Sequence, residues 1–274
     1  MTPKTPSLRS NTTEAAYRAA WKALNLVEDW LTTGYSRAHP DLILEAGGSV
    51  AAVPAEAAGA ALPAEVLAAA APAEAPAARE QRSAALAAIA AEVAACVKCG
   101  LSANRTIAVP GEGSLDPRVL FIGEGPGAEE DRTGRPFVGA AGKYLDTWLR
   151  PIGLERERCF IANCVKCRPP QNREPHPDEI AACLPYLVLQ ISVLKPRVIC
   201  CLGRIAAQTL LGTTASLGQL RGAVHQLPQG IAKLLGNAVP VVVTYHPSAV
   251  LRDKASLRKP VWDDLKLLQS LLAP

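Results

Sequence analysis

Residues 118–142 read "RVLFIGEGPGAEEDRTGRPFVGAAG", a short apolar run that passes directly into a glycine-rich turn. The run RVLFIG is typical of a buried strand, because it is apolar throughout and ends at a glycine. The segment 123–142 contains six glycines, four acidic residues and a single aromatic residue, Phe137. In an α/β protein, a turn of this kind at the carboxyl end of a strand predicts a ligand site there.

The same alternation continues along the rest of the chain. Three more apolar runs predict buried strands at 158–165, 197–203 and 239–247, and helical patterns occupy 140–150, 177–194, 204–211 and 260–272. Strands separated by helices predict an α/β fold of three layers, with a central, mainly parallel sheet flanked by helices.

Each predicted strand ends at a residue suited to a ligand site. Glu124, Asn163, Gly203 and His246 stand at or near the carboxyl ends of the four runs. Because the carboxyl ends of parallel strands meet at one edge of a sheet, these residues are expected to line a single cleft.

The first 82 residues have a different character. Residues 14–35 place apolar side chains at helical spacing after Thr12 or Thr13, which predicts one amphipathic helix within an N-terminal extension, 1–50. Alanine fills 24 of the 45 positions from 51 to 95, and prolines recur in the first part of this stretch. We predict a flexible Ala/Pro-rich linker over 51–82 and a catalytic domain over 83–274.

Charge and cysteine content narrow the class of protein. Residues 1–90 hold seven basic and nine acidic residues, and the remainder holds 22 and 16, so the basic excess lies in the second part. No continuous apolar run reaches the roughly 18 residues of a membrane span, and no leader pattern is visible, which predicts a cytoplasmic protein without a membrane partner. In that compartment the eight cysteines are expected to be metal ligands, reactive groups or core residues rather than disulfides.

The glycine-rich turn is compatible with three kinds of chemistry. Gly123, Gly125, Gly127 and Ala128 fit a dinucleotide-binding pattern, but Pro126 and the residues after it are expected to continue as a loop, and the acids at 129–131 would repel a phosphate. A Walker loop would need a Ser or Thr that "GAAGKY" lacks. The third interpretation is a site for a flat, neutral ring beside Glu124, with Phe137 stacked on it.

Two Cys-x-x-Cys pairs stand in the second part of the chain, Cys96 with Cys99 and Cys164 with Cys167. By spacing alone they predict a tetrahedral zinc site. Strand alternation argues against that quartet, because Asn163 and Cys164 are neighbours on a strand and must face opposite sides of the sheet. If Asn163 faces the cleft, Cys164 faces the core.

Four motifs, taken together, resemble one family. Glu124-Gly-Pro-Gly with Glu130-Asp131, then "TGRPFVG", "NCVKCRPPQNREP" and "HPSAVLR" are similar in kind and order to the family 4 uracil-DNA glycosylases, the iron–sulfur members of that superfamily, over about residues 92–272. The resemblance implies a uracil-DNA glycosylase-like fold and a monofunctional hydrolase. Such an enzyme breaks the N-glycosidic bond of uracil in DNA and leaves an abasic site for base excision repair.

The resemblance also implies a [4Fe-4S] cluster held by Cys96, Cys99, Cys167 and Cys183, in a structural role. Cys164 stands where this family usually has valine, so the zinc quartet remains an alternative. The other cysteines, Cys159, Cys200 and Cys201, lie within apolar strands and are predicted to be core residues.

By the same resemblance, Phe137 stacks on a uracil flipped out of the helix, and Asn163 reads its N3–H and O4. His246 donates to O2 as the base departs, and Glu124 orients or activates the attacking water. Gly125 and Gly127 bind the base through the backbone, and Glu130 positions the ring or the loop. Glu129 and Asp131 are expected to form a solvated face.

The expected partner is uracil-containing DNA, contacted by a monomer, since no feature predicts an oligomer. Ser248, Leu251 and Arg252 lie after the last strand, and Leu251 or Arg252 could fill the gap left by the flipped base. Phosphate contacts are expected from Arg168, Arg173 and Lys166.

Two other functions remain as alternatives. One is a relative that is trapped covalently on uracil through a histidine, for which His176 is available but without the run of basic residues expected around it. The other is a non-catalytic iron–sulfur module that binds nucleic acid or a polymerase, with 14–35 as a docking helix.

Overall fold

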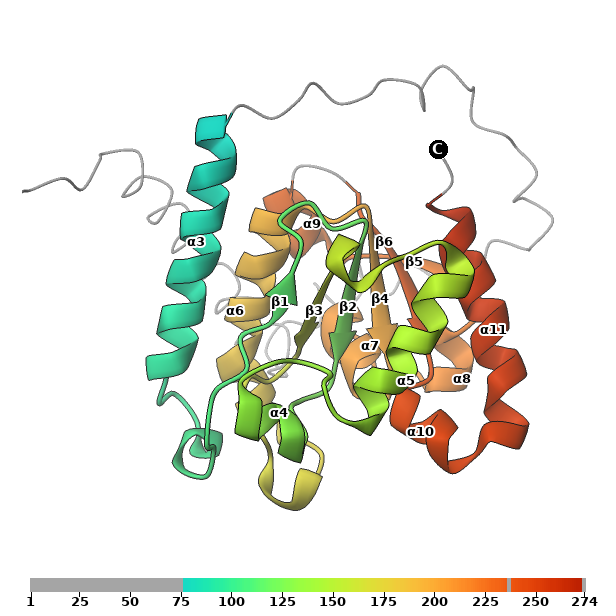
Figure 1. Cartoon of the computed structure of the whole chain (residues 1–274), viewed down its shortest axis with the longest axis horizontal. Coiled ribbons are helices and arrows are strands. Elements are labelled where there is room, and N and C mark those ends of the chain that lie inside the picture. Colours follow the sequence, from blue (N-terminus) through green and yellow to red (C-terminus); the bar gives the residue numbers. More distant parts are fainter. Residues whose placement is uncertain (1–75, 236–237, 273–274) are drawn as a thin grey trace, which may run out of the picture. The chain divides into compact units, whose positions relative to one another are not determined.

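The structure, a computed structural model, describes residues 76–235 and 238–272. The amphipathic helix predicted at 14–35 and most of the predicted linker lie outside the described residues. The described part begins with α3 (Pro76–Ala95) and ends with α11 (Lys254–Ser270). It forms the α/β arrangement that the sequence predicts (Figure 1).

A six-stranded sheet lies at the centre, in the order β1-β3-β2-β4-β6-β5. The four inner strands are parallel and lie within the predicted runs: β2 (Val119–Gly123), β3 (Cys159–Asn163), β4 (Val198–Leu202) and β6 (Pro240–Thr244). The edge strands β1 (Glu112–Gly113) and β5 (Val224–Gln226) pair antiparallel and were not predicted, because so short a segment has no detectable periodicity.

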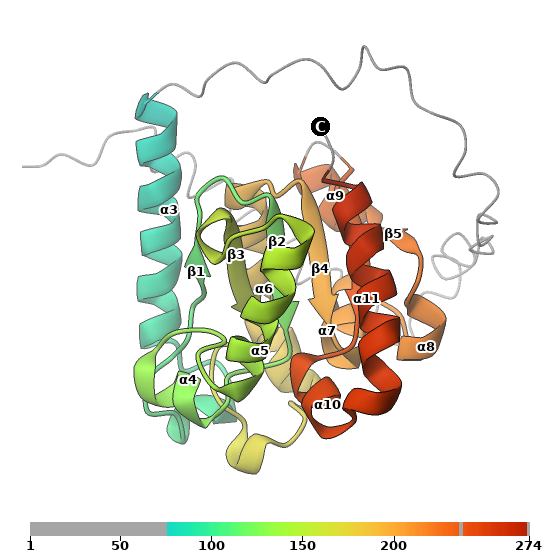
Figure 2. The same cartoon turned by 45° about the vertical axis from the view of Figure 1, so that its right-hand side comes forward.

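The inner strands are apolar on both faces because helices cover both. Figures 1 and 2 show α5 (Ala140–Leu149), α10 (Pro247–Arg252) and α11 on one face, where Trp148 and Leu265 join the core over Phe121. On the other side lie α6 (Pro177–Leu194) and α7 (Arg204–Leu211), with α3 beside α6. Three shorter helices complete the described fold: α4 (Ala128–Thr133), α8 (Leu217–Leu220) and α9 (Gln229–Leu235).

The helices of the described residues differ from the sequence-based expectation at several points. Helix α3 is already present at Pro76, the first described residue, and its alanines are strong helix formers. The last helix begins at Lys254 and contains Pro260, since the Asp253 side chain caps it by accepting from Ser256 N at 3.2 Å. Residues 76–82, which the predicted linker included, are helical.

The loop expected after Pro126 is also wrong, because α4 begins at Ala128. Glu130, three residues after the N-cap Gly127, accepts a hydrogen bond from the Gly127 amide at 3.1 Å, which is half of a capping box. The acids at 129–131 fill the first turn of this helix, so they still argue against a phosphate there.

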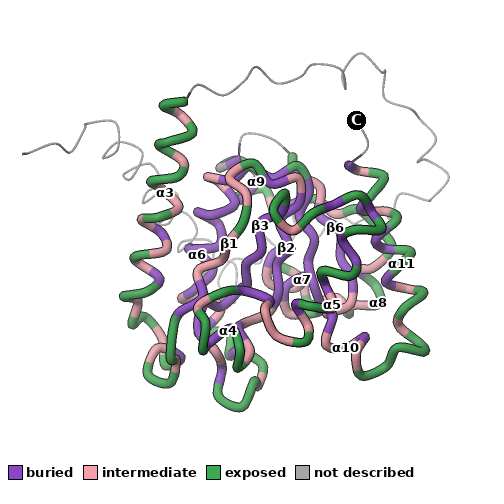
Figure 3. The backbone as a smooth tube through the Cα atoms, viewed as in Figure 1, coloured by how far each residue is buried: buried purple, intermediate pink, exposed green. Residues whose placement is uncertain are grey.

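Burial follows the sheet and α6 (Figure 3). By length and composition alone, with a mean hydropathy of 1.3, helix α6 could cross a membrane, but 61% of it is buried inside the protein. It is the central helix of its layer.

Candidate active site

One pocket of about 400 Å³ opens at the carboxyl ends of the inner strands. All four strand-end residues line it: Glu124, Asn163, Gly203 and His246. Parallel pairing places them there, because the last residues of β2 and β3, Gly123 and Asn163, stand opposite one another in the register. The other predicted residues on its wall are Gly125, Gly127, Glu130, Phe137, Arg173, Ser248 and Arg252.

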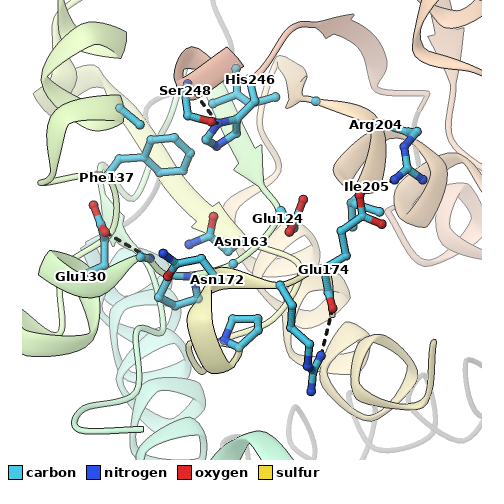
Figure 4. A pocket seen from close by; sticks show the side chains of 18 of the residues that line it. Glu124, Glu130, Phe137, Asn163, Asn172, Glu174, Arg204, Ile205, His246 and Ser248 are labelled. Carbon is cyan, nitrogen blue, oxygen red and sulfur yellow. Dashed lines mark hydrogen bonds and ion pairs between the residues drawn. The ribbon is translucent and has the colours of Figure 1, made fainter. Parts of the chain in front are cut away.

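Asn163 is the most unusual residue of the pocket. Its side chain is 1% exposed, and neither its Oδ1 nor its Nδ2 has a hydrogen-bond partner within the described part of the chain. A buried polar atom without a partner costs about 1–3 kcal/mol. Figure 4 shows this amide facing the same space as the Phe137 and His246 rings. The pocket therefore presents one acceptor and one donor ready for a ligand.

Phe137 is held by an unusual backbone. Its φ is 51°, in the left-handed region, which is rare for an aromatic residue. Its ring centroid lies 5.6 Å from that of His246, with a tilt of 42°. The strained turn is fixed from α5, because a Cβ on Gly142 would lie 1.8 Å from the Phe137 carbonyl oxygen. Only glycine can occupy that position.

Glu130 anchors the same turn from α4. Its Oε1 accepts from the amides of Val138 and Gly139, both at 2.8 Å, and its Oε2 accepts from Gly127. The carboxylate thus accepts from three backbone amides, one before Phe137 in the sequence and two after it. This arrangement suits the positioning role expected of Glu130.

Gly123 is a site residue that the sequence analysis missed. A Cβ at Gly123 would lie 2.4 Å from Asn163 Oδ1 and 2.7 Å from the Phe137 ring. The absence of a side chain on the last residue of β2 thus lets the amide and the ring approach one another. A glycine as the final residue of an otherwise apolar strand was the available signal.

The hydrogen bonds of His246 define its tautomer. Ser248 N donates to His246 Nδ1 at 3.2 Å, and Ser248 Oγ lies 2.8 Å from the same atom. Nδ1 is therefore an acceptor, and the neutral ring carries its proton on Nε2. Burial, aided by the nearby Arg252 guanidinium, lowers the His246 pKa to about 4. The imidazole is a neutral N–H donor at physiological pH.

Glu124 follows β2 directly and lines the pocket beside Glu174 and Arg204 (Figure 4). Burial raises its pKa above the ordinary value of 4.5, and the Glu174 carboxylate raises it further, while the Arg204 guanidinium opposes both. Glu174 itself pairs with Arg204 at 2.5 Å. The two flanking groups therefore act on Glu124 in opposite directions.

Only some of the residues expected to contact DNA line the pocket. Ser248, Arg252 and Arg173 line the pocket, whereas Arg168 and Leu251 do not. Arg168 Nε donates to Asn172 Oδ1 at 2.8 Å, and Arg173 pairs with Glu179 at 2.7 Å. Both interactions hold the loop over residues 168–176 beside the pocket mouth.

Two expectations about charged residues are wrong. Lys166 cannot contact a phosphate, because its side chain is 1% exposed. Asp131 does not belong to a solvated face: it is 5% exposed, and its Oδ1 accepts from Thr106 N at 2.9 Å. Its neighbour Glu129 is exposed and pairs with Arg132, as a solvated residue would.

A second, small pocket brings four cysteines together: Cys96, Cys99, Cys167 and Cys183. Two of the sulfurs accept hydrogen bonds, Cys183 Sγ from Lys166 N at 3.2 Å and Cys167 Sγ from Arg105 Nη1 at 3.1 Å. Cys164, the alternative ligand, is fully buried and is not part of this wall. Cys159, Cys200 and Cys201 are fully buried in the sheet, as predicted.

The set of donor atoms bears on the kind of metal site. Among the described residues, no three His, Cys, Asp or Glu side chains lie together as ligands of a single metal ion. In a four-iron cluster each thiolate binds a different iron atom, whereas a zinc ion takes all of its ligands on one centre. The donor set, four thiols around one pocket with hydrogen bonds to two sulfurs, fits such a cluster.

Comparison with known proteins matches the second part of the chain, which holds the sheet and the pocket. Residues 110–266 match the family model described as "Uracil DNA glycosylase superfamily". The chain is 48% identical to the Type-4 uracil-DNA glycosylase of Pyrobaculum aerophilum, over 63% of this chain and 87% of that protein. It is 44% identical to the Type-4 enzyme of Thermotoga maritima, over 67% and 93%, and 41% identical to that of Archaeoglobus fulgidus, over 67% and 91%.

Proposed function

This chain belongs to the Type-4 uracil-DNA glycosylases, and we propose that the pocket at the sheet edge is where it binds uracil and cleaves it from DNA. The enzyme is a DNA repair hydrolase that breaks the N-glycosidic bond of uracil. Because the chain belongs to a family of glycosylases, the alternative of a non-catalytic module is not needed.

The unpartnered amide of Asn163 is the observation that supports this assignment most strongly. Uracil presents an N3–H donor beside an O4 acceptor, and the two free atoms of the amide, Oδ1 and Nδ2, complement that edge. Cytosine presents the reverse pattern, so an amide in the right orientation rejects it. Phe137 supplies the face on which the flipped ring stacks.

The bond breaks as the base departs with its electrons. His246 donates from Nε2 to uracil O2, where negative charge develops, and Ser248 holds the ring through Nδ1. Because the imidazole is already neutral, it stabilises the uracil anion as a hydrogen-bond donor rather than as a cation. The proton stays on Nε2 through the cleavage step.

Glu124 acts on the sugar side of the bond. As a carboxylate it orients the attacking water and offsets the positive charge that grows on the deoxyribose. The water then supplies the hydroxyl on the sugar carbon, and its proton passes to the carboxylate. Glu130 takes no part in this step, because its oxygens are engaged with backbone amides.

We assign the DNA contacts to the rim of the pocket. Arg168 and Arg173 contact phosphates from the loop over 168–176, and Leu251 or Arg252 fills the space left by the flipped base. The protein acts as a cytoplasmic monomer on uracil-containing DNA.

We assign a [4Fe-4S] cluster to Cys96, Cys99, Cys167 and Cys183, in preference to a zinc ion bound with Cys164. Burial raises the pKa of Cys183 to about 12, so without a metal this thiol stays protonated. When bound, the cluster supplies iron–thiolate bonds that join three separate segments. Its role is structural.

The test is excision from a single-uracil oligonucleotide, with abasic sites cleaved by alkali. We expect product from the parental enzyme, and a loss of about 10²-fold or more in Asn163→Ala and His246→Ala, because both act in the transition state. Affinity for DNA should remain near the parental value in both variants. Excision at the parental rate by either variant would refute the site assignment, and SDS-stable adducts would indicate covalent trapping instead.

The metal assignment has its own test. Cys183→Ser should lose iron and visible absorbance, whereas Cys164→Ser should retain both. Loss of metal from Cys164→Ser alone, or zinc in place of iron in the parental protein, would favour the other quartet.

A further inference from the structure

Lys166 is a buried cation that the proposed mechanism does not use. Its side chain is 1% exposed, and no carboxylate pairs with it in the described part of the chain. Its Nζ donates to the Asn163 carbonyl oxygen at 2.9 Å and to Gln190 Oε1 at 2.7 Å. Burying an ammonium group without a counter-ion is unfavourable by several kcal/mol. A buried lysine that destabilises the fold in this way is expected to have a function.

The main chain of Lys166 faces the cysteine pocket. Its amide donates to Cys183 Sγ, and it belongs to the wall of that pocket next to Cys167. With the proposed cluster bound, the four cysteines would be thiolates, and a cation beside that negative charge would be favoured electrostatically. Lys166 thus lies between the cysteines on one side and Asn163 on the other.

Gln190 fixes the lysine head group in place. This side chain is 2% exposed on α6, the same helix that carries Cys183, and its Nε2 donates to the Pro110 carbonyl oxygen at 2.7 Å. Val109 N donates to the Lys166 carbonyl oxygen at 2.8 Å. All the polar groups of Lys166 therefore have partners, and the network has little freedom to shift.

We propose that Lys166, held by Gln190, is a positioning residue that couples the cysteine quartet to uracil recognition by fixing the backbone of Asn163. This inference rests on the proposed function. The strand pairing of β2 with β3 holds Asn163 on one side, and the Lys166 ammonium holds its carbonyl on the other. Together they fix the direction in which the unpartnered amide faces the pocket.

A double-mutant cycle tests the coupling. Lys166→Met removes the ammonium donor and keeps an unbranched side chain that is one atom shorter. It is measured alone and combined with Asn163→Ala. We expect the single-turnover rate of uracil excision to fall about tenfold or more in the parental background. In the Asn163→Ala background the further loss should not exceed about twofold, the limit expected for an effect already removed. Equal losses in both backgrounds would overturn the proposal.

Three readouts besides activity accompany the cycle. Free uracil should bind Lys166→Met more weakly by a similar factor, while DNA affinity and iron per chain stay at parental values. A rate loss that merely follows a loss of iron would overturn the proposal, because Lys166 would then only support the quartet. The exposed Lys266→Met, which loses a surface pair with Asp263, is the control and should match the parental protein.

Gln190→Leu provides a second route if Lys166→Met does not fold. It leaves the lysine and the cysteines in place and removes only the group that holds Nζ, so the same non-additive pattern with Asn163→Ala is expected. Additive losses here would also overturn the inference. Failure of the proposed function is distinguishable, since the parental enzyme would then release no uracil at all.

Discussion

At the scale of single residues, the site depends on side chains that are absent as much as on those present. Gly123→Ala would place a methyl group 2.4 Å from Asn163 Oδ1 and 2.7 Å from the Phe137 ring. We expect the variant to fold, because α5 and β2 are otherwise unchanged, but to excise uracil at least about tenfold more slowly. A single-turnover assay measures this.

Gly218→Ala is the matched control, since a Cβ there meets nothing within 4 Å. It should excise uracil at the parental rate. A fully active Gly123→Ala enzyme would show that the amide and the ring need not stand so close.

The two charges beside Glu124 predict the pH profile of excision. The ionised carboxylate is the active form, so the rate should fall as pH drops through its pKa, which burial and Glu174 place above 4.5. Glu174→Gln removes a repelling carboxylate and should move the acid limb to lower pH, whereas Arg204→Gln should move it to higher pH. His246 should add no limb near neutrality, because its pKa lies at about 4.

These directions are tested by measuring the single-turnover rate as a function of pH for the parental enzyme, Glu174→Gln and Arg204→Gln. Glu124→Gln serves as the reference that should lack the limb altogether. A limb that moves the same way in both flanking variants would contradict the electrostatic explanation.

Residue roles were predictable from sequence only where a strand end or a motif marked them. Asn163 is the last residue of β3 and His246 follows β6, so the parallel topology alone places both at the same edge of the sheet. Lys166 was mistaken for a surface contact because its hydrogen-bond partners, Gln190 and Asn163, are distant or main-chain groups. No local pattern reveals burial of that kind.

At the scale of elements, the sequence predicted the long, strongly periodic segments well. The four inner strands and α6 and α7 lie where apolar runs and helical patterns indicated. The six-residue α4 and the two edge strands escaped prediction, because a helix of that length is fixed by the Glu130 hydrogen bonds rather than by periodicity. The short edge strands form only by pairing with β3 and β6, and α4 depends on the bonds of Glu130 to Gly127, Val138 and Gly139.

The start of α6 depends on one buried carboxylate. Glu179 accepts from His176 N at 2.7 Å and pairs with Arg173 at 2.7 Å, which joins the helix cap to the loop beside the pocket. Glu179→Gln should lower the free energy of unfolding by about 1–2 kcal/mol. Asp178→Asn, at an exposed position of the same turn, should change it by less than about 0.5 kcal/mol. Denaturant titration measures both.

The effect of Glu179 should depend on pH. Arg173 lowers the Glu179 pKa, so this stabilisation is complete above the pKa of the unfolded chain and is lost as pH falls through the lower folded value. The parental protein and Glu179→Gln should therefore converge in stability at acid pH. A constant difference at every pH would exclude the ionised carboxylate as its source.

At the scale of the whole molecule, the cysteine quartet joins parts that are distant in sequence. Cys96 and Cys99 follow α3, Cys167 follows β3, and Cys183 lies on α6. Protein prepared without iron should unfold at a lower temperature and excise uracil more slowly, because the same link supports the loop after Asn163. Thermal denaturation and excision before and after reconstitution with iron and sulfide test this. A metal-free protein with parental melting temperature would contradict the structural role.

The unpartnered amide of Asn163 also bears on what happens after the bond is cut. The released uracil presents the same edge as uracil in DNA. It therefore forms the same hydrogen bonds with the buried amide of Asn163, and its dissociation from the pocket should be slow. Water must replace it before the next round. Dissociation of uracil should then limit the steady-state rate, so that a rapid first turnover is followed by a slower one. The enzyme without a bound base should have the lowest stability of the species in the cycle.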